Sequence, residues 1–136
     1  MAELMPWDEK KMAVGVREID TQHKNLVAML NKLNAKMKDG KGGEAAREVL
    51  KELVSYTQKH FTTEETLMNK HSYPESPAHT SEHSKLLLQA ADLETRLFAA
   101  KTNAIEIMMF LKNWLTDHIM KTDKKFGAFL NTKGVS

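Results

Sequence analysis

The sequence contains no cysteine, and this absence excludes disulfide bonds, thiolate metal ligands and a cysteine nucleophile. No apolar run approaches the roughly 20 residues that a membrane-spanning helix needs, so we expect no membrane insertion. The N-terminal stretch MAELMPWDEK also lacks the apolar segment of a secretory signal. The expected compartment is therefore the cytoplasm.

Neither sign of charge dominates the chain. The 20 lysines and arginines and the 18 aspartates and glutamates give a formal net charge of +2, and the two signs are interspersed. A nucleic-acid-binding surface would instead gather its basic residues on one element with aromatic residues between them. We therefore expect no nucleic acid partner. The 41% of hydrophobic and 28% of charged residues are typical of a globular protein, and 136 residues suffice for one domain with a buried core.

Proline and glycine are scarce, with three and six residues, and they fall in a few breaks. Pro6 lies in an N-terminal arm over 1–18, DGKGG covers 39–43, SYPESP covers 72–77, and AAKTN at 99–103 is a weaker break. β-Branched residues are sparse and no alternating run stands out, which argues against strands. The intervening segments are amphipathic with helical spacing, at about 19–38, 44–70, 77–99 and 103–121 or further. The sequence predicts an all-α, antiparallel up-down-up-down four-helix bundle over about 19–130, within a single domain that spans 1–136.

Each predicted helix presents one apolar stripe to the core, and these stripes carry several polar residues. We expect Asp20 to cap the first helix. The inward positions are, in chain order, Ile19, His23, Leu26, Leu30, Leu33 and Met37; Ala46, Leu50, Leu53, Thr57, His60, Glu64 and Leu67; His79, His83, Leu86, Ala90, Leu93 and Leu97; and Met108, Leu111, Leu115 and His118. Five of the six histidines therefore fall on an inward stripe.

A buried imidazole needs hydrogen-bond partners and a buried carboxylate needs a counter-charge, because either group left unpaired costs several kcal/mol. Any one of these five histidines alone would more often be a satisfied core or rim residue than a metal ligand. In an antiparallel bundle, however, the start of one helix lies beside the end of the next, which brings all five to one end of the core. His79 and His83 share a helix face, as do His60 and Glu64, because each pair is four residues apart. The pattern predicts a metal site.

The number of candidate ligands argues for more than one ion. Five imidazoles with two or three carboxylates exceed what a four-coordinate zinc can use, whereas mixed nitrogen and oxygen ligation suits a pair of iron or manganese ions. Asp123 fits the pattern least well, because it follows His118 by five residues, about 140° round an ideal helix, and Thr122 holds the regular inward position. Asp123 is either a solvated acid among lysines or a ligand. As a ligand it requires a π-type turn or a carboxylate that reaches across the helix end.

These residues resemble the hemerythrin family, in particular its bacterial single-domain form. The resemblance rests on the stretches PWDEKKMAVGVREIDTQHKNL, HFTTEETLM, YPESPAHTSEHSKL and WLTDHIMKTDKKF, which run along nearly the whole chain. It implies a non-haem, oxo- or hydroxo-bridged di-iron centre. The implied ligands are His79, His83 and His118 on one iron, His23 and His60 on the other, and Glu64 and Asp123 as bridges. The resemblance thus decides in favour of Asp123 as a ligand.

The resemblance also implies a binding place for dioxygen, at the open coordination position of the iron that has only two imidazoles. A dry apolar lining would oppose autoxidation. By matching position this lining would comprise Leu26, Phe61, Trp114, Leu115 and Ile119, each of which is also a good core residue. Phe126 stands where the invertebrate oxygen carriers tend to have a tyrosine, which removes no ligand. Glu65, Glu82 and His71 match no ligand position, and we expect all three to face solvent.

Three functions stay open at this point. The resemblance favours reversible dioxygen binding by a protein that is not an enzyme, for storage or for delivery to an oxygen-consuming enzyme. The Glu-x-x-His motif of bundle-type di-iron enzymes is absent, which agrees with that choice. The alternatives are an oxygen- or redox-sensing module that acts on a separate signalling partner, and reduction of peroxide or nitric oxide at the same irons. No apolar surface patch is obvious, so the expected state is a monomer.

Overall fold

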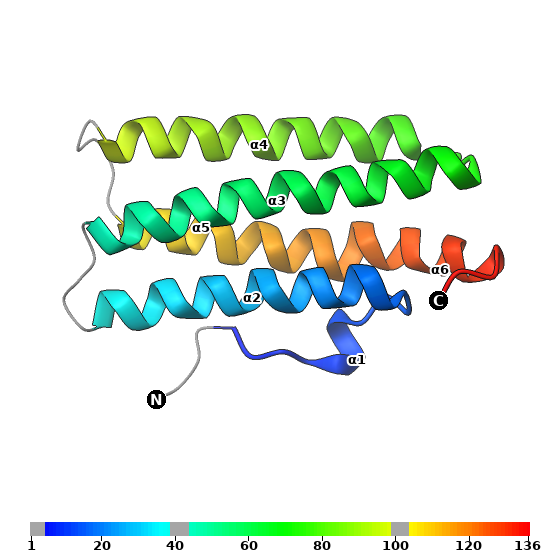
Figure 1. Cartoon of the computed structure of the whole chain (residues 1–136), viewed down its shortest axis with the longest axis horizontal. Helices are drawn as coiled ribbons and strands as arrows, with labels where there is room; N and C mark the ends of the chain where they lie inside the picture. Colours follow the sequence, from blue (N-terminus) through cyan, green and yellow to red (C-terminus); the bar gives the residue numbers. More distant parts are fainter. Residues whose placement is uncertain (1–4, 39–43, 99–103) are drawn as a thin grey trace.

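The computed structural model describes residues 5–38, 44–98 and 104–136, and long antiparallel helices dominate it (Figure 1). Each long helix forms because its apolar residues recur every three or four positions and give it one face to bury. The elements are α1 (Glu9–Met12), α2 (Arg17–Lys38), α3 (Glu44–His71), α4 (Ser76–Phe98), α5 (Ala104–Asp117), the π-helix η1 (His118–Asp123) and α6 (Lys124–Thr132). No strand occurs in these three ranges. The all-α prediction is therefore confirmed.

The helices close into a four-membered ring. α2 packs against α3 and α5, and α4 packs against the same two helices on the other side (Figure 1). α5, η1 and α6 continue one another and together form the fourth member. The start of α2, the end of α3, the start of α4 and η1 consequently lie at one end of the bundle, where the sequence placed the histidines. None of the described helices is long and apolar enough to cross a membrane.

Buried apolar side chains form two separate clusters along the bundle axis. The larger one occupies the middle and includes Leu26, Leu53 and Leu115. The smaller one lies at the α6 end and includes Ile19 and Phe126. Each fully buried leucine or phenylalanine contributes roughly 1.5–3 kcal/mol to stability. The sequence between the clusters on each helix supplies the polar residues of the candidate site.

Several boundaries differ in detail from the sequence predictions. α2 begins at Arg17, three residues before the expected cap, so Asp20 lies in its first turn and the N-cap prediction was wrong. The Asp20 carboxylate instead accepts a hydrogen bond from the Val14 N–H at 2.7 Å and ties the preceding arm to the helix. The SYPESP break separates α3 from α4, although Pro77 itself sits in the first turn of α4, where proline is tolerated. The predicted breaks at 39–43 and 99–103, and the side chain of Ala46, lie outside the described residues.

The α4–α5 face carries more exposed apolar surface than the sequence suggested. Leu88 is 73% exposed, and a groove of about 450 Å³ is lined in part by Leu88, Leu93 and Phe110. Lys85, Gln89 and Asp92 also line this groove, so it is no continuous apolar patch. The monomeric state stays a prediction.

The N-terminal arm crosses α6 at a glycine. A Cβ added to Gly127 would lie 2.2 Å from the Val14 carbonyl oxygen, which is closer than atoms can approach. Gly15 then turns the chain with a positive φ of 84°, and its carbonyl accepts a hydrogen bond from the Asn131 side chain at 3.0 Å. Only glycine at 127 allows the arm to lie this close to α6.

Replacing Gly127 with alanine is expected to lower the free energy of unfolding by about 1–3 kcal/mol, the usual cost of overpacking. Alanine is favoured over glycine inside a helix by about 1 kcal/mol, but the Val14 backbone must move to admit the methyl group. Thermal unfolding followed by circular dichroism measures the effect. Ala128→Ser, on the exposed side of the same helix, serves as the control and should shift stability by no more than about 0.5 kcal/mol. A Gly127→Ala protein as stable as the parent would show that the arm yields freely.

Candidate metal centre

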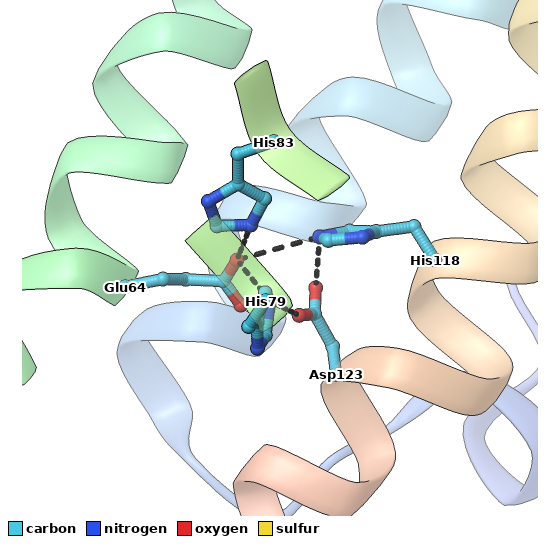
Figure 2. Close-up of side chains that lie close together, drawn as sticks. All are labelled: Glu64, His79, His83, His118 and Asp123. Carbon is cyan, nitrogen blue, oxygen red and sulfur yellow. Dashed lines mark hydrogen bonds and ion pairs between the residues drawn. The ribbon is translucent and has the colours of Figure 1, made fainter. Parts of the chain in front are cut away.

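A layer of polar side chains crosses the core between the two apolar clusters. α2 contributes one residue to this layer, and α3, α4 and η1 contribute two each. The members are His23, His60, Glu64, His79, His83, His118 and Asp123, and all seven are buried. Figure 2 shows five of them, and their polar ends converge from three helices. All seven residues expected from the sequence are thus brought together at one place.

The layer divides into two groups of atoms that could each surround a cation. One group comprises the ligand atoms of Glu64, His79, His83, His118 and Asp123, and the other those of His23, His60, Glu64 and Asp123. Within each group all the atoms lie within 4.8 Å of one another. Both carboxylates belong to both groups. The geometry therefore suits two cations that share two bridging carboxylates.

Three imidazoles approach the carboxylates in the first group. Nε2 of His83 lies 3.0 Å from Oε1 of Glu64, and Nε2 of His118 lies 3.0 Å from Oδ2 of Asp123. Nε2 of His79 lies 3.1 Å from Oδ1 of Asp123. Each imidazole therefore turns the same nitrogen, Nε2, toward the centre of the layer.

The second group has two imidazoles. Nε2 of His23 lies 2.7 Å from Oδ2 of Asp123 and 3.1 Å from Nε2 of His60. Nε2 of His60 is 3.6 Å from Oε1 of Glu64. Here too every Nε2 faces inward, so the two groups differ mainly in having three imidazoles and two.

Several inward atoms are close to their neighbours without forming a hydrogen bond. They include Nε2 of His79, Nε2 of His83, Oε2 of Glu64 and Oδ1 of Asp123. A buried polar atom without a hydrogen bond costs about 1–3 kcal/mol, so a fold rarely gathers several of them. A cation would accept their lone pairs. The mixture of imidazole nitrogen and carboxylate oxygen is also the set that iron binds, so these residues fit a pair of iron ions.

The imidazoles around them keep both carboxylates ionised. Burial raises the pKa of Glu64, as does the nearby charge of Asp123, but His60, His118 and His79 outweigh both and lower it to about 2. Burial likewise raises the pKa of Asp123, but its charge interaction and close contact with His118, together with the nearby rings of His23 and His60, bring it well below its ordinary value. The carboxylates of Glu64 and Asp123 are therefore both available as anionic ligands.

The carboxylates act on the imidazoles in return. Burial lowers the pKa of His79, but its close contacts with the carboxylates of Asp123 and Glu64 raise it to about 9. The pKa of His118 is likewise raised well above its ordinary value by Asp123, against the effect of burial. The pKa of His83 is lowered, because burial outweighs its contact with Glu64. A metal ion would have to displace protons from His79 and His118.

The π-helix explains how Asp123 reaches the layer. η1 runs from His118 to Asp123, and in a π-helix residues five apart lie on the same face. Both residues are buried, whereas Thr122, the regular inward position of an α-helix, is only partly buried. Of the two routes that the sequence left open for Asp123, the π-type turn is the one that occurs.

A second ring of polar residues contacts the outer nitrogens of two imidazoles, and the sequence interpretation missed it. Nδ1 of His60 donates a hydrogen bond to the side-chain carbonyl of Gln22 at 2.7 Å. Nδ1 of His118 donates to Oε1 of Glu82 at 3.0 Å. Gln22 and Glu82 each directly precede an inward histidine, so each lies on the flank of the buried stripe, beside the next helix. This position in the sequence could have indicated that they contact the ligands.

The expectation that Glu82 faces solvent was incomplete. Its side chain is 39% exposed, but its carboxylate is turned toward His118 and Thr122 and accepts a hydrogen bond from each. Glu65 comes no closer than 4.0 Å to Nδ1 of His83, beyond hydrogen-bond range. His71, at the end of α3, is partly buried rather than exposed and takes no part in either group of ligand atoms.

The five residues expected to line an oxygen pocket are all buried in the larger apolar cluster, namely Leu26, Phe61, Trp114, Leu115 and Ile119. The Phe61 ring stacks on His83 with a centroid distance of 3.7 Å and an interplanar angle of 5°. Trp114 lies edge-on to His118 at 5.6 Å. The smaller apolar cluster covers the other side of the polar layer, where the ring centroids of Phe126 and His79 are 5.4 Å apart. Apolar side chains therefore flank the polar layer on both sides.

The chain is similar to known proteins along most of its length. A family model described as the hemerythrin HHE cation binding domain matches residues 14–130. A bacteriohemerythrin of Methylococcus capsulatus is 35% identical over 129 residues, 94% of this chain and 98% of that protein. A bacteriohemerythrin of Pseudomonas aeruginosa is 37% identical over 123 residues, 90% of this chain and 78% of that protein.

Solved structures agree with the sequence relatives. A crystal structure of wild-type hemerythrin superposes with a TM-score of 0.85 at 35% identity, and the match covers 93% of this chain and 98% of that one. A crystal structure of a hemerythrin mutant gives a TM-score of 0.86 at 34% identity, with coverage of 95% and 98%. The similarity thus extends to the whole bundle.

Proposed function

This chain belongs to the hemerythrin family, and from that premise we propose that it binds dioxygen reversibly at a non-haem di-iron centre. The observation that carries the proposal is the pair of ligand groups that share Glu64 and Asp123 and differ by one imidazole. Storage or delivery of oxygen, without turnover of a substrate, is the role that this arrangement supports best.

We assign seven residues as ligands of the two irons. His79, His83 and His118 would hold one iron, His23 and His60 the other, and Glu64 and Asp123 would bridge them. When bound, such a pair of irons supplies an open coordination position for dioxygen and the electrons to hold it reversibly. The group that contains His23 and His60 has one imidazole fewer than the other group. We therefore assign the open coordination position to the iron that this group would hold.

The apolar side chains beside the layer supply the dry surroundings that reversible binding needs. Leu26, Leu115 and Ile119 have no exposed surface, and Phe61 covers one face of the His83 ring. Because water and anions enter such surroundings poorly, loss of a reduced oxygen species from the site is opposed. We propose these residues, with Trp114, as the lining of the oxygen pocket.

An optical titration tests the function. The protein loaded with ferrous iron should develop a visible charge-transfer band when oxygen is added, and the band should disappear when oxygen is removed under argon. Repeating the cycle on one sample measures reversibility. Direct conversion to a ferric spectrum that argon does not reverse would contradict oxygen carriage.

Two other functions would use the same ligands, and each has its own test. Reduction of peroxide or nitric oxide predicts steady consumption of either compound in the presence of a reductant. Sensing predicts that oxygen changes binding to a separate protein partner. For an oxygen carrier we expect neither sustained turnover nor an oxygen-dependent partner.

A further inference from the structure

We propose that Glu82 is a positioning residue of the metal centre, which orients His118 and makes it a stronger donor than its counterpart His60. The outer nitrogen of His118 is held by a carboxylate, whereas that of His60 is held by the neutral amide of Gln22. The inference rests on the di-iron assignment of the proposed function but not on reversible oxygen binding.

The first step is the orientation of the ring. Nδ1 of His118 donates to Oε1 of Glu82 at 3.0 Å, and this contact leaves Nε2 of the same ring directed at Asp123 and Glu64. An imidazole whose Nδ1 carries the proton must offer the lone pair of Nε2 to a metal. Glu82 thus selects the tautomer and the direction of the donor atom.

Glu82 also holds the far end of η1. The Thr122 hydroxyl lies 3.0 Å from Oε1 and 3.1 Å from Oε2 of Glu82 and donates a hydrogen bond to this carboxylate. One carboxylate on α4 therefore contacts η1 at its first residue and at the residue before Asp123. Both ligands on η1 depend on this anchor, His118 directly and Asp123 through its neighbour.

His60 has a different support. Its Nδ1 donates to Oε1 of Gln22 at 2.7 Å, and Nε2 of Gln22 in turn donates to the Thr63 hydroxyl at 3.1 Å. Gln22 is only 8% exposed, so its amide is fixed in place. Hydrogen bonds therefore fix the orientation of both His60 and His118, but the partner of His60 carries no negative charge.

The difference between the two supports has an electronic consequence. A hydrogen bond to a carboxylate is roughly twice as strong as one between neutral groups, and it increases the basicity of a ligating imidazole. A more basic donor favours the more highly charged ferric state. The iron beside His118 should therefore be the more readily oxidised of the two, and Glu82 should lower its reduction potential.

Metal affinity tests the positioning role. Glu82→Ala is expected to weaken binding of ferrous iron, titrated without oxygen, by about 10- to 100-fold, as is typical when such an outer partner is lost. Glu65→Ala is the matched control, because it removes an equal charge near His83 without breaking a hydrogen bond. Glu82 lines an open surface cavity of about 280 Å³, so its loss need not prevent folding. An affinity equal to that of Glu65→Ala would overturn the proposal.

The reduction potential tests the electronic role separately. Glu82→Gln keeps a hydrogen-bond acceptor for His118 and removes only the charge, so the centre should stay loaded and its midpoint potential should rise. The rise should exceed that of Glu65→Gln, which controls for charge alone. Gln22→Glu places a carboxylate behind His60 and should lower the potential. Equal shifts in Glu82→Gln and Glu65→Gln would overturn the proposal even if Glu82→Ala did not fold.

The parent protein separates this inference from the proposed function. If the parent binds two irons and the Glu82 variants match their Glu65 controls, only the inference fails. A parent that binds no iron contradicts the di-iron assignment itself, and the inference falls with it. A parent that binds iron but not oxygen contradicts the carrier function alone, because potentials and affinities can still be compared.

Discussion

Replacing Glu64 with alanine is expected to empty the metal centre. The Glu64 carboxylate belongs to both ligand groups, so one substitution removes a donor from each proposed iron. It also leaves the nearby imidazoles of His79, His83 and His118 without their shared anionic neighbour. We expect a loss of iron affinity of more than about 100-fold, beyond the range that outer partners produce. Iron content after anaerobic loading and desalting measures it.

His71→Ala is the control for this substitution. It removes the only histidine outside the polar layer, from a position at the end of α3. Its iron content should equal that of the parent. An emptied centre in His71→Ala, or a full one in Glu64→Ala, would show that the assigned set of ligands is wrong.

Loading with iron is expected to raise the midpoint of thermal unfolding by about 10–20 °C. A ligand that binds only the folded state at 100 times its dissociation constant stabilises that state by about 2.7 kcal/mol, and two such sites contribute about 5 kcal/mol. For a domain of this size each kcal/mol moves the midpoint by about 2–4 °C or somewhat more. Unfolding of the parent protein before and after removal of iron by a chelator measures the difference.

The increase in the unfolding midpoint that iron produces should itself become larger as the pH rises. In the metal-free fold the pKa of His79 is raised from 6.5 to about 9, so its protonated form stabilises that fold. This contribution is fully present below about pH 6.5 and is lost as the pH rises through about 9. Iron bound to the ring nitrogen excludes the proton, so the loaded protein never has this contribution. The unfolding midpoints of the iron-loaded and iron-free protein should therefore differ more at pH 9 than at pH 6.5.

Two results would contradict this account of stability. A difference that shrinks as the pH rises would mean that His79 does not have to lose a proton to bind iron. Equal midpoints with and without iron would mean that the polar layer is satisfied without a metal. Glu64→Ala, carried through the same series, should show no response to iron at any pH.

The bundle and six of the seven members of the polar layer could be predicted because they depend on spacing along each helix. His60 and Glu64 are four residues apart, and regular helices fix which face such a pair shares. The antiparallel order of the helices then brings His23, His79 and His118 to the same end. Periodicity and helix order are thus enough to gather these residues, whereas Asp123 was assigned through the family resemblance.

The remaining features depend on contacts between helices, which spacing does not specify. The start of α2 at Arg17 was missed because Asp20 resembles a cap and instead binds the Val14 N–H of the arm. Glu82 was taken for a surface residue because nothing on α4 itself shows that Nδ1 of His118 lies 3.0 Å away on η1. The π-helix was one of two alternatives until the structure placed Asp123, since both routes put a carboxylate at the same point.

The π-helix also shifts the phase of everything that follows it. Along α5 and into η1 the buried positions include Leu111, Leu115 and His118, and an unbroken α-helix would continue them at Thr122, Lys125 and Phe129. The buried positions are instead Asp123 at the end of η1 and then Phe126 and Leu130 in α6, each one position later. The single extra residue in the turn therefore turns Lys125 to the outside and Phe126 into the core. The same local irregularity that delivers a carboxylate to the polar layer sets which side of the last helix is hydrophobic.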